Sequence, residues 1–396
     1  MHDEEFRMNY KTLLKPRKLI AVLKQRLAIR AALNRSIKLG VVRFRSDPNW
    51  RPDLVPGNFA PRKSPPQDDS ALLKRISVAY QKAKLAQRSA SETYNVSNEW
   101  IHIYERKLGP VMKALSEGDI PELDRIYSNF FRDSCSTGLA GLPSNLEKKY
   151  YGPRIRNRYV KIALIEALHR FDLWKQRTAN AYTVKDLVSP IIGNPYGATI
   201  DGEFLRPGFD YHHAYAHEIK QLLASTGKYL IAELGGGFGG LGYYIVRDIP
   251  EMTYIDLDLP EATALASYYL MKAFPDLPVA LYGEIELNQE TLNKYRIVMM
   301  PSFEITKLAN KSVGITFNSY SLAEMSPSTI EEYVAEITRI TSGYFLHINH
   351  SRNSVVSADN FGVEDRGFQL IRRRLAGWTV GLNPDSDEFE YLYKAN

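Results

Sequence analysis

One short stretch constrains the fold of this chain more than any other. Residues 230–234, Leu-Ile-Ala-Glu-Leu, are apolar except for one acid, and they run directly into the glycine-rich residues 235–240. A short apolar run bounded by glycines is typical of a buried strand. Glycine has no Cβ and tolerates positive φ, so the backbone of such a turn can approach a ligand closely. The stretch predicts a strand, a ligand-binding turn and a following helix.

Short apolar strands and helical patterns alternate after this turn. We expect strands at 229–234, 252–258, 279–281, 297–300, 313–318 and 344–349, and helices at 241–247, 261–273 and 329–340. Residues 378–382 and 389–393 are expected to form a closing antiparallel pair. Alternation of this kind indicates a mostly parallel sheet with helices on both faces. We therefore predict an α/β domain over residues 189–396.

The first 45 residues differ from the rest of the chain in charge. They contain twelve Lys and Arg but only three acids, so their net charge is +9, whereas the net charge of the whole chain is +6. Leu19, Leu23, Leu27 and Ala31 recur at helical spacing within this stretch, which predicts a basic amphipathic helix over residues 1–45. Three roles remain open for it: packing on its own protein, contact with an anionic membrane surface, or contact with a partner protein.

Two further segments separate this helix from the α/β domain. Residues 46–70 contain six prolines, which exclude a regular helix or central strand and predict a linker or an extended surface segment. Apolar residues then recur every three to five positions, so residues 71–188 are predicted to form a helical domain that covers the acceptor side.

Charge and cysteine content exclude several classes of protein. Because the formal charges of residues 46–396 sum to −3, this part of the chain is not a basic surface for nucleic acid. The single cysteine, Cys135, excludes an internal disulfide and a cysteine-cluster metal site. We expect a cytoplasmic protein, with peripheral membrane contact left open through residues 1–45. The oligomeric state is not predicted.

The glycine turn allows two kinds of nucleotide-containing ligand. Gly235, Gly237 and Gly240 satisfy the dinucleotide pattern G-x-G-x-x-G, which alone is a weak signal. Glu233, however, stands at the strand end just before the turn, where a carboxylate suits a cationic or amino-bearing ligand. A second strand ends in Asp256-Leu257-Asp258, and an acid at that point can accept both ribose hydroxyls of an adenosine. Asp258 is nearer the strand end and is preferred over Asp256.

Three segments together resemble a known family. AELGGGFGG (232–240), YIDLDLPEA (254–262) and NSYSLAEM (318–325) resemble the sugar O-methyltransferases of the class I S-adenosyl-L-methionine (SAM) dependent superfamily. The resemblance implies a Rossmann-like methyltransferase domain with a mostly parallel seven-stranded sheet. It also implies SAM as the cofactor and methyl transfer to a sugar hydroxyl of a polysaccharide, glycoconjugate or glycosylated metabolite. The expected cofactor-binding residues are Glu233, Gly235, Gly237, Gly239, Asp258 and Asn318.

Methyl transfer to a sugar hydroxyl needs a general base, because the hydroxyl must lose its proton as the new bond forms. We expect this base to be His213, with Glu324 and His350 as the other candidates. The expected acceptor contacts are Asn194, Tyr211, His212, Ser319 and Asn349. His213 and His217 lie one helical turn apart, but no carboxylate lies between them as in metal motifs, so no metal site is predicted.

Two alternatives to this reading remain. One is an NAD(P)-dependent oxidoreductase that uses the G-x-G-x-x-G turn, although the chain lacks a suitably placed Tyr-x-x-x-Lys pair. The other is a methyltransferase-like assembly partner without activity. The intact glycines and acids of the turn argue against lost cofactor binding.

Overall fold

The structure, a computed structural model, describes residues 16–62, 68–96, 101, 103–352 and 354–396. Its α-helices are α1 Pro16–Phe44, α2 Val55–Asn58, α3 Ser70–Gln87, α5 Gly109–Glu117, α6 Ile120–Tyr127, α7 Ser144–Tyr150, α8 Asn157–Arg177, α9 Phe209–Leu223, α10 Gly240–Asp248, α11 Pro260–Ala273, α12 Gln289–Leu292 and α13 Pro327–Ile340. Its strands are β1 Ala198–Ile200, β2 Glu203–Leu205, β3 Leu230–Leu234, β4 Thr253–Asp258, β5 Val279–Leu281, β6 Ile297–Pro301, β7 Val313–Ser319, β8 Thr341–His350, β9 Phe368–Leu375 and β10 Glu388–Ala395.

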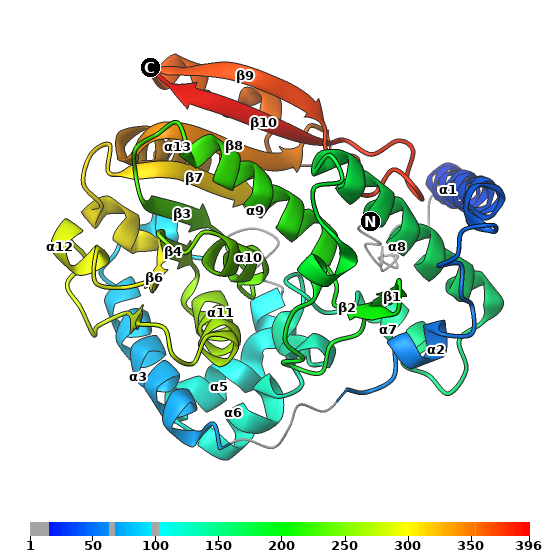
Figure 1. The fold of residues 1–396 in the computed structure, drawn as a ribbon, viewed down its shortest axis with the longest axis horizontal. Coiled ribbons are helices and arrows are strands. Elements are labelled where there is room, and N and C mark those ends of the chain that lie inside the picture. The colour runs from blue at the N-terminus through cyan, green and yellow to red at the C-terminus, as the bar shows by residue number, and fades with distance from the viewer. Residues whose placement is uncertain (1–15, 63–67, 97–100, 102, 353) are drawn as a thin grey trace.

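The C-terminal half is built on one large sheet (Figure 1). Its eight strands have the order β5-β6-β4-β3-β7-β8-β10-β9. Strand β10 is antiparallel to β8 and to β9, and the other neighbouring pairs are parallel. The strand after β3 in sequence lies on one side of it and β7 lies on the other, so the order reverses between β3 and β7. The predicted Rossmann-like fold is confirmed, with eight strands in the described sheet where seven were expected.

Helices cover both faces of this sheet, as the alternation predicted. Ile231 of β3 joins the core formed with α9, α10 and α11, while its neighbour Ala232 joins the core formed with α13. Figure 1 shows α9, α10 and α11 in front of the strands and α13 behind them. Because successive side chains of a strand point to opposite faces, every residue of β3 is buried.

The closing antiparallel pair differs from the prediction. Strand β10 pairs with β9, residues 368–375, whereas residues 378–382 form an irregular segment. Strand β9 was not predicted, because the arginines at positions 372–374 interrupt the apolar pattern expected of a core strand. Two of them, Arg372 and Arg374, donate to the buried carboxylate of Glu390 in β10 at 2.6 Å. Trp378 was mistaken for a strand residue because it is apolar, but it packs in a loop and donates to Tyr215.

The helical half packs beside the sheet and does not extend it. Helices α3, α5 and α6 pack together, α3 also packs against α11, and α8 packs against α9. In the proline-rich segment, Val55 and Phe59 are buried, and the Phe59 ring stacks on Tyr150 with centroids 4.3 Å apart. The described part of this segment is therefore packed against the helical half.

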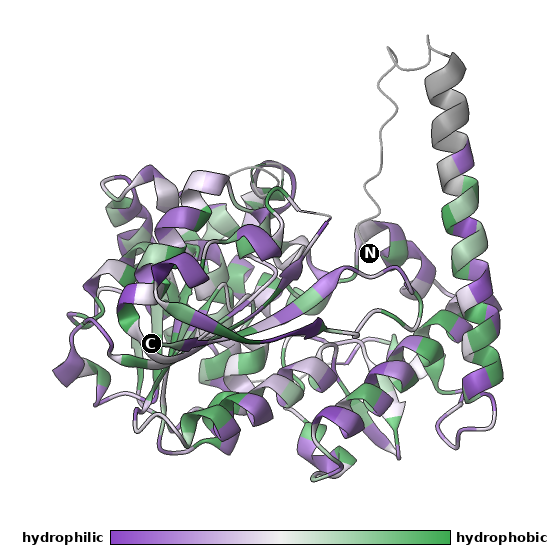
Figure 2. Cartoon of the chain, turned by 90° about the horizontal axis from the view of Figure 1, so that it is seen from above, coloured by the Kyte–Doolittle hydropathy of each residue, from purple (hydrophilic) through white to green (hydrophobic). Residues whose placement is uncertain are grey.

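Helix α1 makes up the described part of the predicted basic helix; residues 1–15 lie outside the described chain. Its C-terminal part packs on α8 through Ile37 and Phe44, which contact Ile165 and Leu168. Residues 27–32 are exposed, and Figure 2 shows this part of α1 standing away from the body. Within the described residues, no helix is both long enough and apolar enough to cross a membrane.

Candidate active site

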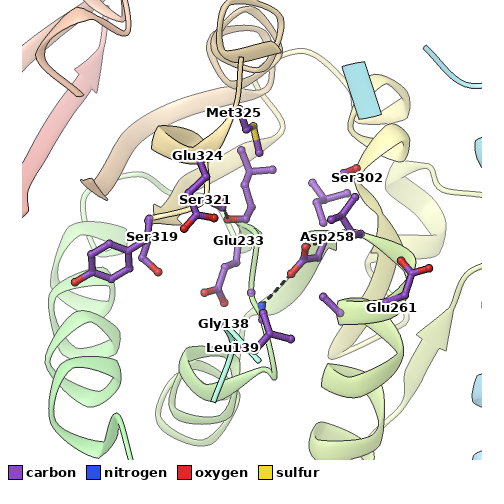
Figure 3. Close-up of a pocket in the computed structure, with 18 of the residues that line it drawn as sticks. Gly138, Leu139, Glu233, Asp258, Glu261, Ser302, Ser319, Ser321, Glu324 and Met325 are labelled. Carbon is purple, nitrogen blue, oxygen red and sulfur yellow. Dashed lines mark hydrogen bonds between the residues drawn. The ribbon is translucent and has the colours of Figure 1, made fainter. Parts of the chain in front are cut away.

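A cavity of about 170 Å³ lies at the carboxyl ends of β3, β4 and β7 (Figure 3). This is the edge of the sheet where the strand order reverses, and open α/β sheets bind their ligands there. The sheet half lines it with Glu233–Phe238, Leu257–Leu259, Glu261, Ser302, Ser319–Ser321, Glu324 and Met325, and α9 adds Tyr211 and His212. The helical half covers it with Thr93–Val96, Tyr104, Leu108, Cys135, Gly138 and Leu139.

The glycine turn requires glycine for its conformation. Gly235 and Gly237 have φ of 76° and 63°, and both line the cavity. A Cβ on Gly235 would lie 2.5 Å from the Ser321 hydroxyl oxygen, so no larger residue fits there. Gly239, with φ of 82°, does not line the cavity but is the residue from which α10 begins. The turn thus places Gly235 and Gly237 at the cavity, and Gly239 caps the start of α10.

Two carboxylates face the cavity beside this turn. The Glu233 side chain accepts a hydrogen bond of 2.5 Å from the Tyr254 hydroxyl. Burial raises the pKa of Glu233 to about 7; the Tyr254 hydrogen bond opposes this rise and the charge of Asp258 adds to it. Asp258 accepts from the backbone N–H of Gly237 at 2.9 Å, and burial raises its pKa to about 6. A cation bound here would favour the ionised form of both groups.

The neighbouring Asp256 has a different position. It is fully buried, and its Oδ1 accepts from the backbone N–H of Gly236 at 3.1 Å. Its Oδ2 has no hydrogen-bond partner in the described structure. Burial, together with the negative charges of Asp258 and Glu233, raises the pKa of Asp256 well above its ordinary value. Of the two aspartates only Asp258 lines the cavity, which favours it as the ribose-binding residue.

The cavity is acidic. Glu233, Asp258, Glu261 and Glu324 line it, and no Lys or Arg is found among its lining residues in the described chain. Figure 3 shows Glu233, Asp258 and Glu324 around one space, with Glu261 farther to the right. The Glu261 carboxylate accepts hydrogen bonds from the hydroxyls of Tyr104 and Tyr80, at 2.5 and 3.0 Å, and pairs with Lys84 at 3.1 Å. The arrangement suits a ligand with positive charge more than one with phosphates.

Two predicted contact residues instead hold the loop that follows β7. The Asn318 amide donates to the carbonyl of Leu234 at 2.9 Å and to the Ser321 hydroxyl at 2.5 Å. The Asn349 amide donates to Asn318 Oδ1 at 3.0 Å and accepts from the N–H of Ala323 at 3.1 Å. Both asparagines are fully buried and neither lines the cavity. They position residues 319–325 at its edge.

The two neighbouring histidines of α9, His212 and His213, point in different directions. Successive residues of an α-helix point about 100° apart, and here His212 lines the cavity whereas His213 points away from it. His213 is buried against Trp174, whose indole N–H donates to its Nδ1 at 3.1 Å. Burial lowers the pKa of His213 to about 4, so it is neutral at pH 7. The structure therefore does not support the prediction of His213 as the general base.

Two other predicted residues also lie outside the cavity. His350 pairs with Asp387 at 3.1 Å, and its ring lies 5.7 Å from that of Tyr320, one layer behind the lining. The Asn194 amide donates to Asn129 at 2.6 Å and ties two loops of the helical half. By contrast, Tyr211, His212, Ser319 and Glu324, which were also predicted as site residues, line the cavity.

Several lining residues were not predicted. Tyr104, Cys135 and Leu139 come from the helical half, and Tyr104 belongs to a π-helix, Tyr104–Leu108, a type of turn common at functional sites. Their approach depends on contacts between residues far apart in the sequence, such as Tyr104 with Glu261, which no local pattern reveals. Ser302 could have been found, because it directly follows the apolar run of β6. Among the described residues, no group of three or more His, Cys, Asp or Glu side chains is arranged to hold a metal ion.

Comparisons with known proteins give weak similarity to solved structures. No family model matches the sequence, and no curated protein matches it either. Geranyl diphosphate methyltransferase solved in complex with SAM is 11% identical, covering 47% of this chain and 87% of its own, with a TM-score of 0.33.

Two further solved structures show similarity of the same order. Magnesium protoporphyrin IX methyltransferase from Synechocystis PCC 6803, with bound SAM, is 9% identical over 62% of this chain and 100% of its own (TM-score 0.35). The pyocyanin biosynthetic protein PhzM is 12% identical over 46% of this chain and 54% of its own (TM-score 0.31). At this level of similarity the comparisons assign no function to this chain.

Proposed function

We propose that this protein is a SAM-dependent O-methyltransferase that transfers a methyl group to a hydroxyl of a sugar. The observation that carries the proposal is the acidic cavity at the glycine turn, with Glu233 and Asp258 facing it. SAM has a sulfonium and an amino group, so it presents positive charge to these carboxylates. Its adenosine presents two ribose hydroxyls, which one carboxylate can accept.

The backbone N–H groups of the turn favour SAM over a dinucleotide. In dinucleotide-binding folds, such N–H groups and the following helix N-terminus bind the pyrophosphate. Here the N–H groups of Gly236 and Gly237 already donate to Asp256 and Asp258. A pyrophosphate at this turn would face the carboxylates of Glu233 and Asp258, and these two glycines would offer it no free donor. This argues against the NAD(P)-dependent oxidoreductase.

The residues of the cavity divide into a cofactor group and an acceptor group. Asp258 is placed to accept the ribose hydroxyls, and Glu233 to pair with the amino end, while Gly237 allows close approach. When bound, SAM supplies a methyl group already activated on a sulfonium. The protein's contribution is to hold the acceptor hydroxyl in line with that group, to exclude water and to take up the proton.

Glu324 is the proton acceptor that best fits the cavity. Its carboxylate lines the acceptor side next to Ser319 and Ser321 (Figure 3). His212 fits the role less well, because Arg206 lies 3.3 Å from its Nδ1 and arginine can only donate. The proton of the neutral imidazole is then on Nε2, which makes His212 a hydrogen-bond donor. We assign proton uptake to Glu324 and orientation of the acceptor to His212.

The sugar acceptor is supported by the resemblance of residues 318–325 to the sugar O-methyltransferases. The three solved structures described above have names that mention geranyl diphosphate, magnesium protoporphyrin IX and pyocyanin. The polar side chains of Ser319, Tyr211 and His212 on the acceptor side are compatible with a hydroxylated ligand.

Titration of the purified protein with SAM and with NADH tests this function. We expect SAM to bind and NADH not to bind. Incubation with SAM and a panel of glycosides should then yield S-adenosylhomocysteine (SAH), and Glu324→Gln should lower this turnover by about 10²–10⁴-fold with SAM affinity unchanged. Binding of NADH instead of SAM would favour the oxidoreductase, and binding of neither would favour the assembly partner.

A further inference from the structure

The side of α1 that faces away from α8 is exposed and partly apolar. Leu27, Leu39 and Val42 are 65%, 62% and 67% exposed. At about 100° per residue, these three side chains fall within about 120° of the helix circumference. Ile37 and Phe44, which pack the helix on α8, lie on the opposite side. Three exposed apolar residues therefore share one side of α1, away from its contact with α8.

Three cations lie on the same side of α1. Lys24, Arg35 and Lys38 are exposed and fall within the same part of the circumference. The whole helix contains eight Lys and Arg and neither Asp nor Glu. Arg43 pairs with Asp172 of α8 at 2.9 Å, whereas the three cations have no acidic partner among the described residues. We refer to these cations and the three apolar residues as the outward face: Lys24, Leu27, Arg35, Lys38, Leu39 and Val42.

None of the other described elements covers the outward face. In Figure 2, α1 stands at the edge of the molecule, and hydrophilic and hydrophobic residues are interleaved along its length. The three apolar side chains of the face stay in contact with solvent, since each is more than half exposed. Exposed apolar surface that is rimmed by polar residues is typical of a site that contacts another molecule.

The charge of the helix and its apolar side chains together select among the possible occupants. A second copy of α1 would bring eight more cations against the first eight, and like charges repel. A nucleic acid would neutralise the cations but would leave Leu27, Leu39 and Val42 in water. An anionic bilayer satisfies both groups, because its headgroups pair with Lys and Arg while apolar side chains enter the boundary between headgroups and acyl chains. The long stems of Lys and Arg can lie along apolar surface with their charges at the headgroups.

We propose that the outward face of α1 binds a bilayer that contains anionic lipids, with the helix lying in the plane of the bilayer surface. At 1.5 Å per residue, the face extends over about 27 Å from Lys24 to Val42. Cations and apolar side chains are mixed along this length, so the contact depends on both the headgroup charge and the apolar interior. This inference does not depend on the reaction proposed for the cavity.

Vesicle flotation with the full chain tests this proposal. The vesicles consist of phosphatidylcholine alone or of an equimolar mixture of phosphatidylcholine and phosphatidylglycerol. A charge variant combines Lys24→Gln, Arg35→Gln and Lys38→Gln, and an apolar variant combines Leu27→Gln, Leu39→Gln and Val42→Gln. Glutamine favours helices about as well as Lys, Arg and Leu and better than Val, so α1 should be retained in both variants.

Two matched controls make the same kinds of change elsewhere on the exposed surface. The charge control combines Lys74→Gln, Lys220→Gln and Lys228→Gln. The apolar control combines Leu85→Gln, Val355→Gln and Leu375→Gln. Because every replaced side chain is exposed, thermal melts of all four proteins should stay close to that of the wild type.

We expect the wild type to float with the anionic vesicles and not with phosphatidylcholine alone, and to bind more weakly as salt is added. Each Lys or Arg near an anionic bilayer strengthens binding about fivefold, so the charge variant should bind about 10²-fold more weakly. The apolar variant should bind at least tenfold more weakly, and both controls should bind like the wild type.

Three results would overturn the proposal. They are failure of the wild type to float with the anionic vesicles, equal flotation with both kinds of vesicle, and equal binding by the charge variant and its control. Weaker binding by the charge variant but not by the apolar variant would indicate a purely electrostatic contact, such as one with nucleic acid, and would also overturn it.

Discussion

Binding of SAM should release protons from Glu233. The carboxyl group has a pKa of about 7 in the cofactor-free protein, because it is buried beside Asp258. At pH 7 about half of the molecules therefore carry a proton on Glu233. A cation placed next to this carboxylate favours the ionised form and lowers its pKa. The bound state then holds fewer protons than the free state.

The size of the effect follows from that pKa. If the bound carboxylate is fully ionised, about half a proton leaves Glu233 per cofactor at pH 7, and about 0.9 at pH 6. SAM affinity should therefore be about tenfold lower at pH 6 than in the fully ionised protein, and about twofold lower at pH 7. Asp258, with a pKa of about 6, acts in the same direction over a lower pH range.

Calorimetry in phosphate and in Tris, which differ in ionisation enthalpy, counts these protons. Because the amine of SAM also titrates, the informative quantity is the difference between wild type and Glu233→Gln, which should lack the half proton at pH 7. Tyr254→Phe removes the hydrogen bond that stabilises the Glu233 carboxylate, so it should raise the count towards one. Equal proton release by the wild type and Glu233→Gln would refute the placement of Glu233 against the cation.

Three further outcomes are expected. Gly237→Val should abolish SAM binding in calorimetry, because Gly237 lines the cavity with positive φ. The thermal melt should stay cooperative, because the added Cβ would meet only Leu139, at 3.7 Å. His213→Gln should keep turnover within about twofold of wild type, since His213 lies outside the cavity, and a loss near the 10²-fold expected of a base would restore it to that role. Burial lowers the pKa of His347 to about 3. Its unfolded form takes up a proton below pH 6.5 and its folded form does not, so the free energy of unfolding should fall between pH 6.5 and 3 by at most about 5 kcal/mol, as urea titrations of wild type and His347→Phe can show.

The acidic side of the cavity could be predicted from the sequence. Glu233, Gly235, Gly237 and Asp258 lie in or next to two strands, and a strand that is buried on both faces has a strong local pattern. Once the strands are known to be parallel, their carboxyl ends must meet at one edge of the sheet. The chemistry of that edge then follows from the residues that end each strand.

The sequence by itself determined the alternation of strands and helices, the glycine turn and the acids beside it, because these depend on neighbours in the chain. Only the tertiary structure decided that His212 and not His213 reaches the cavity, since the rotation of α9 is set by packing against α8 and α10. It also decided that Tyr104 and Leu139 cover the site, and that Asn349 supports a loop from outside the cavity lining. These outcomes depend on which surfaces, far apart in the sequence, pack together, and a local pattern of hydrophobicity does not specify that packing.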